Sequence, residues 1–369
     1  MVALGTRPEC IKLAPVVAAL QARDRDFRTI VCSSGQQREL LDQALRTFQL
    51  AVDRDLDVMR PDQSLAELTA ALVTGFTAAI VDLRPDRLVV QGDTTTAFAA
   101  ALAAYYQRIP VAHVEAGLRS HDRFNPFPEE INRRYISAIA DIHFAPTEAA
   151  ACALRAEGVA AAAIHVTGNT IVDALMSLRS RLETPDGSDL TSTPIRRLAA
   201  GSPVILVTCH RRENFGDNLA AILRAVRRIA VSHPGHRIVF PIHLNPNIRD
   251  TVIPTLGDVA NIHLLNPISY PDSIHLLSRA SLVLTDSGGL QEEAPSFGVP
   301  VLVLRLKTER PEVIETGLAE LVGVDEDHIV ARATNLLARS SHMTSRPISN
   351  PFGDGHASDR IVNVLANVP

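Results

Sequence analysis

Residues 87–107, RLVVQGDTTTAFAAALAAYYQ, decide the fold class of this chain. An apolar run at 87–90 leads through a polar turn into an alanine-rich segment of helix length at 97–107, and a second apolar run follows at 111–114. An apolar strand joined through a helix to the next apolar strand is typical of a parallel sheet that helices cover on both faces. The stretch therefore predicts an α/β fold.

The same alternation continues on both sides of this stretch. Further strands are expected at 2–4, 29–32, 142–145, 164–167, 204–208, 238–242, 262–265, 282–285, 301–304 and 318–322, and further helices at 65–82, 218–231, 289–297 and 356–367. A single sheet of about twelve strands would be unusual, so two sheets of about six fit better. Residues 184–203 are rich in Pro, Gly, Ser and Thr, which predicts a loop and a domain boundary between 167 and 203. The first strand is short, as a trimmed start would make it.

The composition excludes several classes of protein. Hydrophobic residues make up 46% of the 369 residues and charged residues 21%, which is an ordinary globular mixture. A net charge of −5 and the absence of Trp argue against a nucleic-acid partner or a basic membrane surface. The four cysteines are widely separated, so no zinc-site spacing is present. We expect reduced thiols, no metal, no spanning or signal segment and a cytoplasmic location.

The turn after the first strand is a candidate anion site. It reads Gly5-Thr6-Arg7-Pro8-Glu9, in which glycine permits a tight turn and proline suits the start of a helix. Helix amides favour an anion, Arg7 adds a phosphate-binding fork, and Lys12 follows one turn on. This pattern is neither the dinucleotide fingerprint nor a Walker loop, so NAD and ATP are not expected. A surface turn with a solvated arginine is the alternative.

A second candidate anion site lies in the other half of the chain. Thr285-Asp286-Ser287-Gly288-Gly289 joins a strand to a helix, and its small residues let backbone amides approach a phosphate. Glu293 follows on the first turns of that helix, where a carboxylate can accept the two hydroxyls of a ribose. Arg310, within 308–312, supplies another cation after the next strand. The alternative is that the glycines serve only helix–sheet packing.

Three carboxylates of the first half are candidates for proton transfer. Asp93 and Glu115 each follow a strand directly, where ligands of open α/β sheets bind. Glu129 opens a helix that two prolines precede, and Arg133 lies one turn further on. Alone, these residues are also compatible with an N-cap and a surface ion pair.

A histidine of the second half completes the set. His210 follows the strand 204–208 and precedes Arg211, so a general-acid role beside a phosphate is attractive. His243 lies at another strand end, although packing would explain it as well. Each half thus presents an anion-binding turn, which suits a diphosphate-linked sugar nucleotide that bridges a cleft.

These motifs together resemble a known family. GTRPECIKLAPV, VVQGDTTTAFAAALAAYY, HVEAGLRS, PFPEEINRR, VTGNTIVDAL, HRRENFG, IHLNPN, TDSGGLQEEAPSFGVPVLVLR and TERPEV are similar to the non-hydrolysing UDP-N-acetylglucosamine 2-epimerases, collinearly from Gly5 to about Gly355. The resemblance implies an α/β, GT-B-like fold of two Rossmann-like, doubly wound domains that face a cleft. They would span residues 1–167 and 168–354, with a last helix, 355–369, packing back on the first.

The resemblance also implies a reaction and its residues. Members interconvert UDP-GlcNAc and UDP-ManNAc without a cofactor, by eliminating UDP to a 2-acetamidoglucal and adding it back, and they form homodimers. Asp93, Glu115 and Glu129 would move the C2 proton, and His210 would donate to the leaving phosphate. The remaining substrate contacts implied are Arg7, Lys12, Arg133, Arg211, His243, Ser287, Gly288, Gly289, Glu293 and Arg310.

Two departures and three rival functions stay open. Gln37 stands where members regulated by a second UDP-GlcNAc carry His, and Ser273 stands where an aromatic residue often lies near the uracil. A GT-B glycosyltransferase would bind the same nucleotide sugar but needs only one base. A hydrolysing epimerase would release ManNAc and UDP, and a nucleotide-sugar sensor would bind without turnover.

Overall fold

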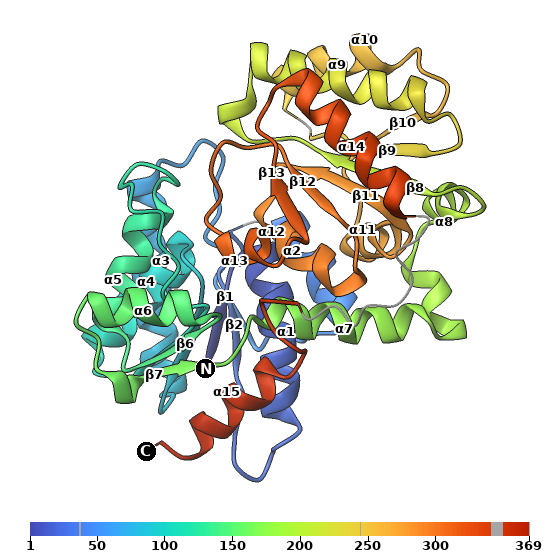
Figure 1. Ribbon diagram of the computed structural model, residues 1–369. Helices are drawn as coiled ribbons and strands as arrows, with labels where there is room; N and C mark the ends of the chain where they lie inside the picture. Colours follow the sequence, from blue (N-terminus) through green and yellow to red (C-terminus); the bar gives the residue numbers. More distant parts are fainter. Residues whose placement is uncertain (37, 244, 341–349, 369) are drawn as a thin grey trace. The chain divides into compact units, whose positions relative to one another are not determined.

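The computed structural model describes residues 1–36, 38–243, 245–340 and 350–368, so Gln37 lies outside the described residues. The chain divides into two compact units, shown in Figure 1. Unit 1 comprises Met1–Ser177 and Phe352–Pro369, and unit 2 comprises Leu178–Pro351.

Unit 1 contains a parallel sheet of seven strands in the described residues, in the order β3-β2-β1-β4-β5-β6-β7. The strands are β1 (Val2–Leu4), β2 (Val31–Ser33), β3 (Arg54–Asp55), β4 (Leu88–Gln91), β5 (Val111–Val114), β6 (Ile142–Ala145) and β7 (Ile164–Val166). The helices are α1 (Arg7–Gln21), α2 (Arg38–Phe48), α3 (Leu65–Leu83), α4 (Thr95–Tyr106), α5 (Glu129–Ile139), α6 (Glu148–Ala156), α7 (Thr170–Leu182) and α15 (Ala357–Ala366). Strand β1 is as long as β2, so the short first strand is no exception in this sheet.

Strands β1, β2, β4, β5 and β6 are buried, and most of their residues are apolar. Helix α4 packs against α3 and α5, while α1 packs against α2 and α15. Helix α3 is, by length and composition alone, apolar enough to cross a membrane. Only 22% of this apolar window is buried, and its buried side chains, which include Leu72 and Phe76, belong to the core of unit 1.

Helix α15 is tied to unit 1 by one buried carboxylate. Asp173 of α7 accepts hydrogen bonds from the backbone amides of Ala357 and Ser358, at 3.2 and 2.7 Å, and from the Ser358 hydroxyl. The division between the units falls within α7, after Ser177, inside the interval of 167–203 predicted for the boundary and after residue 167, where the resemblance implied the first domain would end. The first turns of α7 stay with unit 1 because Ile171, Val172 and Leu175 are buried.

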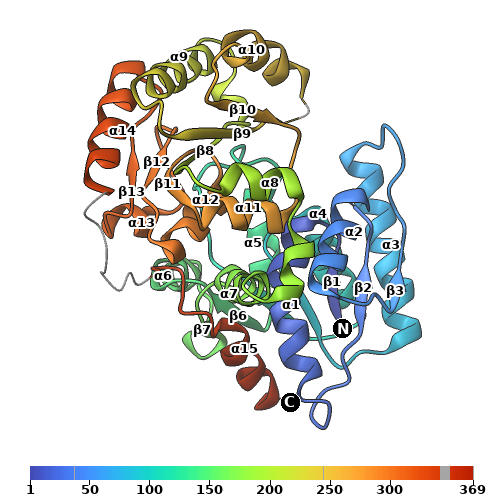
Figure 2. The ribbon, with the colours of Figure 1, turned by 90° about the vertical axis from the view of Figure 1, so that its right-hand side faces the viewer.

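Unit 2 contains a parallel sheet of six strands in the described residues, in the order β10-β9-β8-β11-β12-β13. The strands are β8 (Val204–Thr208), β9 (Arg237–Pro241), β10 (Ile262–Leu265), β11 (Ala280–Thr285), β12 (Val301–Val303) and β13 (Ala319–Leu321). The helices are α8 (Thr193–Ala199), α9 (Asp217–Ser232), α10 (Pro246–Leu256), α11 (Tyr270–Leu277), α12 (Gly288–Glu293), α13 (Pro311–Glu315) and α14 (Glu326–Ser340). Figure 2 shows α9 and α10 side by side along this sheet, as their packing requires.

Two sequence predictions are wrong in detail. Part of 184–203, predicted to be a loop, forms helix α8, because Pro194 suits its first turn and Ile195 and Ala199 are buried. The helix predicted over 289–297 is α-helical only to Glu293 and continues as a 3₁₀ turn, Ala294–Phe297, in which Pro295 removes a backbone donor.

Both sheets are doubly wound. Successive strands are added outward on one side of a central point and then on the other, and this switch point lies between β1 and β4 in unit 1 and between β8 and β11 in unit 2. Ligands of such sheets bind beyond the carboxyl ends of the strands at this point. Predicted site residues follow the strands on either side of both switch points. Each unit therefore carries polar side chains at the position where its topology favours a ligand site.

Candidate active site

Unit 1 gathers two carboxylate–cation pairs at the carboxyl ends of neighbouring strands. Strands β4 and β5 pair with Gln91 opposite Val114, so Asp93 and Glu115 leave the sheet side by side. The Lys12 ammonium of α1 forms an ion pair with the Glu115 carboxylate. The Arg133 guanidinium of α5 forms another with Asp93. Four of the predicted residues thus lie in one cluster.

The backbone of Glu115 adopts a left-handed conformation, with φ of 63°. A side chain at such a φ is uncommon and costs on the order of 1–2 kcal/mol. Gly117 follows with φ of 93°, and a Cβ there would lie 2.3 Å from the Ala150 carbonyl oxygen of α6. The strand end therefore makes a sharp turn that glycine permits and that directs Glu115 out of the sheet.

The two glutamates that open α5 have different environments. Glu129 is half-buried and lies one turn before Arg133 on the same helix. Glu130 is fully buried, lies 3.4 Å from the Arg133 guanidinium and accepts the backbone amide of Ser120 at 2.9 Å. Glu130 is a fixed structural group, and sequence reasoning had no signal to separate it from its neighbour.

The turn after β1 is held by a residue that sequence reasoning quoted but did not assign. Glu9 is fully buried, and one of its oxygens accepts the backbone amides of Gly5 and Thr6 at 2.9 and 2.8 Å. Its other oxygen accepts the hydroxyl of Thr94, the N-cap of α4. Glu9 thus links the Arg7 turn to the turn that carries Asp93. Gly5 is needed here for close approach, since a Cβ would lie 1.9 Å from the Ser34 hydroxyl.

Burial raises the pKa of Glu9 to about 7, against the hydrogen bonds it accepts. A folded pKa above the ordinary 4.5 means that its contribution to stability is greatest below pH 4.5 and is lost as pH rises to about 7. We expect the unfolding free energy of the wild type, relative to Glu9→Gln, to fall by up to ~3 kcal/mol over that range. Urea titrations at several pH values measure this difference.

Glu67→Gln is the matched control, because Glu67 holds the same capping position in exposed helix α3. The Ser64 hydrogen bonds lower the pKa of Glu67, so its contribution is present above pH 4.5 and is lost as pH falls. The two variants should therefore show opposite pH trends. Parallel trends would contradict the burial of Glu9.

Unit 2 places its predicted histidine beside a buried aspartate. Strands β8 and β11 pair with Thr208 opposite Thr285, so His210 and Asp286 leave the sheet together. Asp286 is fully buried, and its oxygens accept the backbone amides of His210 and Arg211, both at 2.9 Å. Burial lowers the pKa of His210, and Asp286 opposes that effect. The ring of His243 lies parallel to that of His210, with centroids 6.2 Å apart.

The glycine turn of unit 2 admits a guanidinium. A Cβ on Gly288 would lie 2.7 Å from the Arg310 guanidinium carbon, so Arg310 packs directly on the backbone at the start of α12. The Arg310 Nε also donates to buried Glu292 at 2.6 Å. The Glu293 carboxylate lies beside Gly289, 3.8 Å from the position of a Cβ. The predicted Ser287–Gly289 turn, Arg310 and Glu293 therefore form one cluster.

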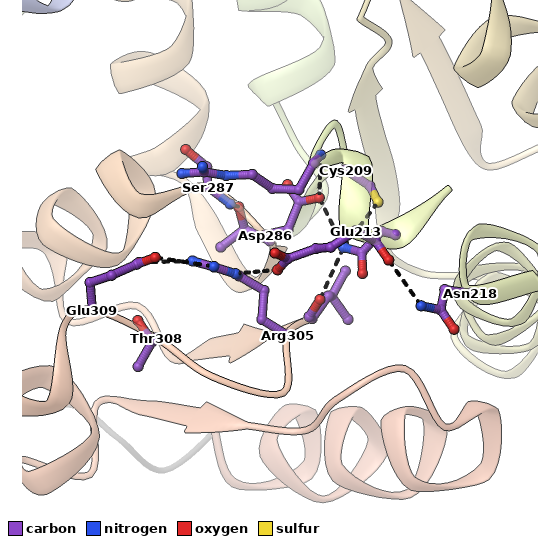
Figure 3. A network of polar contacts seen from close by, with 12 residues as sticks. Cys209, Glu213, Asn218, Asp286, Ser287, Arg305, Thr308 and Glu309 are labelled. Atoms are coloured by element: carbon purple, nitrogen blue, oxygen red, sulfur yellow. Dashed lines mark hydrogen bonds and ion pairs between the residues drawn. The ribbon is translucent and has the colours of Figure 1, made fainter. Parts of the chain in front are cut away.

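A buried arginine clamps two loops of this cluster, as Figure 3 shows. Arg305 follows β12 and donates to Glu213 at 2.6 Å and to Glu309 at 2.9 Å. Glu213 belongs to the loop after His210, and Glu309 precedes Arg310. Burial would raise the pKa of Glu309, but the Arg305 hydrogen bonds and charge hold it at about 2. Sequence reasoning did not identify Arg305, which lies at the end of an apolar run.

Arg305→Met should destabilise the protein by about 2–3 kcal/mol at pH 7, because two carboxylates lose their cation. The Glu309 contribution is present above its ordinary pKa of 4.5 and is lost as pH falls towards 2. The difference between wild type and variant should therefore shrink over that interval in urea titrations. Arg332→Met is the control, because its single, partly exposed pair with Glu320 should contribute little at any pH. An undiminished difference at low pH would contradict the role of Arg305.

Within the described residues no cluster of three or more His, Cys, Asp or Glu side chains is arranged to hold a metal ion. The charged groups of both clusters are instead paired cations and carboxylates. Such groups suit proton transfer and anion binding at a substrate.

Comparison with known proteins identifies the family. The family model "UDP-N-acetylglucosamine 2-epimerase" matches residues 18–366. The chain is 46% identical over 372 residues to the UDP-N-acetylglucosamine 2-epimerase of Escherichia coli K12, covering 98% of this chain and 97% of that protein. The chain belongs to the UDP-N-acetylglucosamine 2-epimerase family. It is thus an isomerase of nucleotide sugars.

Solved structures of family members agree with this assignment. The Neisseria meningitidis enzyme bound to UDP-GlcNAc has a TM-score of 0.91 and 42% identity, covering 100% of this chain and 99% of that one. The Methanocaldococcus jannaschii enzyme, in complex with UDP-GlcNAc and UDP, has a TM-score of 0.84 and 33% identity, covering 100% and 99%. The two Rossmann-like units accordingly make the GT-B-like fold of this family.

Proposed function

We propose that the protein catalyses the reversible epimerisation of UDP-GlcNAc at C2, giving UDP-ManNAc through elimination and re-addition of UDP. The observation that carries the proposal is the pair of carboxylate–cation contacts at adjacent strand ends, Glu115–Lys12 and Asp93–Arg133. Inversion at C2 requires a proton to leave one face of the sugar and return on the other. Two carboxylates supported by cations supply that chemistry at one sheet edge.

The proton at C2 is not adjacent to a carbonyl, so it is weakly acidic. Cleavage of the C1–O bond must therefore lead, with positive charge at C1 and negative charge on the departing diphosphate. We assign C2 proton transfer to Asp93, Glu115 and Glu129, and contacts with the sugar and phosphate to Lys12, Arg133 and Arg7. Because the C1–O bond breaks as the C2 proton leaves, no free carbanion has to form at C2.

The unit 2 cluster supplies groups for the departing UDP. Arg310, beside the Ser287–Gly289 turn, would neutralise charge that grows on the diphosphate, and Arg211 and His243, the neighbours of His210, would contact the same group. A bound diphosphate raises the pKa of a neighbouring imidazole, so His210 would be protonated in the complex and donate to the leaving oxygen. Glu293 would accept the ribose hydroxyls.

Proton NMR of UDP-GlcNAc with the pure protein in deuterated buffer tests this proposal. Deuterium at C2 of UDP-GlcNAc and UDP-ManNAc together is the expected result. An ¹⁸O label in the bridging C1–O position should also scramble into the diphosphate, because that bond breaks and re-forms.

Three other outcomes would refute the proposal. Release of free ManNAc with UDP would indicate the hydrolysing reaction. Transfer of GlcNAc only when an acceptor is added, with no deuterium at C2, would indicate a glycosyltransferase. Binding without any change in the sugar would indicate a sensor.

Two further properties belong to the same proposal. Widely spaced cysteines support a cytoplasmic enzyme without disulfides, and family resemblance supports a homodimer with no nucleic-acid or membrane partner. Light scattering of the purified protein at micromolar concentration tests the dimer.

A further inference from the structure

We infer that Asp286 is a positioning residue that holds His210 in a single tautomer, with Nδ1 protonated and Nε2 directed to the substrate. The inference deepens the proposed function, because His210 is the group assigned to the leaving diphosphate. Asp286 itself is fully buried and acts through the histidine.

The geometry of the Asp286 carboxylate carries the inference. One oxygen, Oδ2, accepts the backbone amides of His210 and Arg211 and the side-chain amide of Asn214, at 2.9, 2.9 and 3.0 Å. The other oxygen, Oδ1, accepts the His210 backbone amide at 3.2 Å and lies 3.3 Å from Nδ1 of the His210 ring. Both oxygens therefore hold the loop, and Oδ1 is also the oxygen that faces the ring.

A carboxylate facing Nδ1 decides which nitrogen carries the proton. An ionised carboxylate is an acceptor and carries negative charge, so at 3.3 Å it favours the tautomer in which the facing Nδ1 carries the proton. In the neutral ring Nε2 then carries the lone pair, and in the protonated ring Nε2 carries the proton that can be transferred. A carboxylate placed in this way orients the imidazole and stabilises its cation.

Among the charged groups near His210, one residue stabilises the protonated ring. The titratable groups that act on the ring are Asp286 at the end of β11, Arg211 in the same loop and His243 after β9. Arg211 and His243 both disfavour the imidazolium, and Asp286 alone among these favours it. His210 keeps 38% of its side chain exposed, so its ring remains open to a ligand.

Asp286→Asn tests the inference with minimal disturbance. Its amide oxygen can occupy the Oδ2 position and keep the two backbone bonds of 2.9 Å, losing only the longer one to Oδ1, while its amide nitrogen then faces Nδ1 as a donor. The ring must adopt the opposite tautomer, with the proton on Nε2. We expect kcat to fall on the order of 10²-fold with little change in KM. The alkaline limb of the kcat profile should move to lower pH.

Nitrogen NMR of ¹⁵N-histidine-labelled protein gives a readout that does not depend on turnover. In the wild type above the pKa, Nε2 of His210 should resonate as an unprotonated nitrogen and Nδ1 as a protonated one, and Asp286→Asn should exchange these assignments. His210→Asn identifies the signals. Asp286→Glu, which keeps a carboxylate, should restore part of the wild-type tautomer and pH profile.

Asn214→Ala is the matched control for loop stability. It removes a bond to the same Asp286 oxygen and one to the Leu304 carbonyl without changing the group that faces the ring. We expect a lower melting temperature but an unshifted alkaline limb and an unchanged tautomer.

An unchanged His210 tautomer in Asp286→Asn would overturn the inference, as would a pH profile that moves equally in Asn214→Ala. Absence of C2 exchange in the wild type would instead refute the proposed function. The NMR comparison would still report on Asp286 in that event.

Discussion

Glu115→Gln is expected to slow the exchange of deuterium into C2 of UDP-GlcNAc by about 10²- to 10⁴-fold, because glutamine cannot accept or return a proton. The amide keeps the size of the side chain. We therefore expect affinity for the nucleotide sugar to stay within about tenfold. Proton NMR in deuterated buffer measures the exchange, and calorimetric titration with UDP-GlcNAc measures the affinity.

Glu148→Gln serves as the control for Glu115. Glu148 is an exposed carboxylate of unit 1, paired with Arg155 on the surface of α6. Its replacement should leave C2 exchange at the wild-type rate. Near-wild-type exchange in Glu115→Gln would show that another group performs the proton transfer.

Gly117→Ala is expected to cost more than about 4 kcal/mol of stability, or to prevent folding. The new methyl group would lie 2.3 Å from the Ala150 carbonyl oxygen, and φ of 93° is strained for any side chain. Since Ala150 contributes backbone atoms of α6, no side-chain rotation relieves the contact. Thermal and urea unfolding of the purified variant measure the loss.

Gly158→Ala separates the two causes. Gly158 has φ of 89°, close to that of Gly117, but a Cβ there would meet nothing within 4 Å. Its replacement should lower the free energy of unfolding only by the strain of a side chain at positive φ, about 1–2 kcal/mol. Equal losses in both variants would mean that the contact with α6 contributes nothing.

The strands and helices were largely predictable because their signal is local. Apolar runs such as 111–114 and 142–145 coincide with β5 and β6. Strand β3 was missed because its two residues, Arg54 and Asp55, are exposed and polar. It is an edge strand whose hydrogen bonds to β2 alone define it.

Only those site residues that lie at the ends of predicted strands could be identified from the sequence. Asp93, Glu115 and His210 stand within two residues of the ends of apolar strands, so position and residue type together identify them. Their partners do not follow from any local pattern. Lys12 meets Glu115 across 103 residues of sequence, and His210 meets Asp286 across 76.

Burial is the second property that the sequence did not disclose. Glu9 lies within a turn that was predicted to bind an anion through its arginine. Asp286 lies within a turn that was predicted to do so through its glycines. Both are fully buried, and each joins two segments far apart in the chain. The sequence of a polar motif does not distinguish a carboxylate that contacts a substrate from one that is buried and fixes a loop.

The return of the chain to unit 1 has a consequence for biosynthesis. Unit 2 is one uninterrupted segment, whereas unit 1 needs Phe352–Pro369 as well as its first 177 residues. During translation unit 2 therefore has all of its sequence before helix α15 has been made. Until those last residues emerge from the ribosome, α1 lacks a packing neighbour and Asp173 lacks its donors. Unit 1 therefore depends on the last residues of the chain for its completion, whereas unit 2 does not.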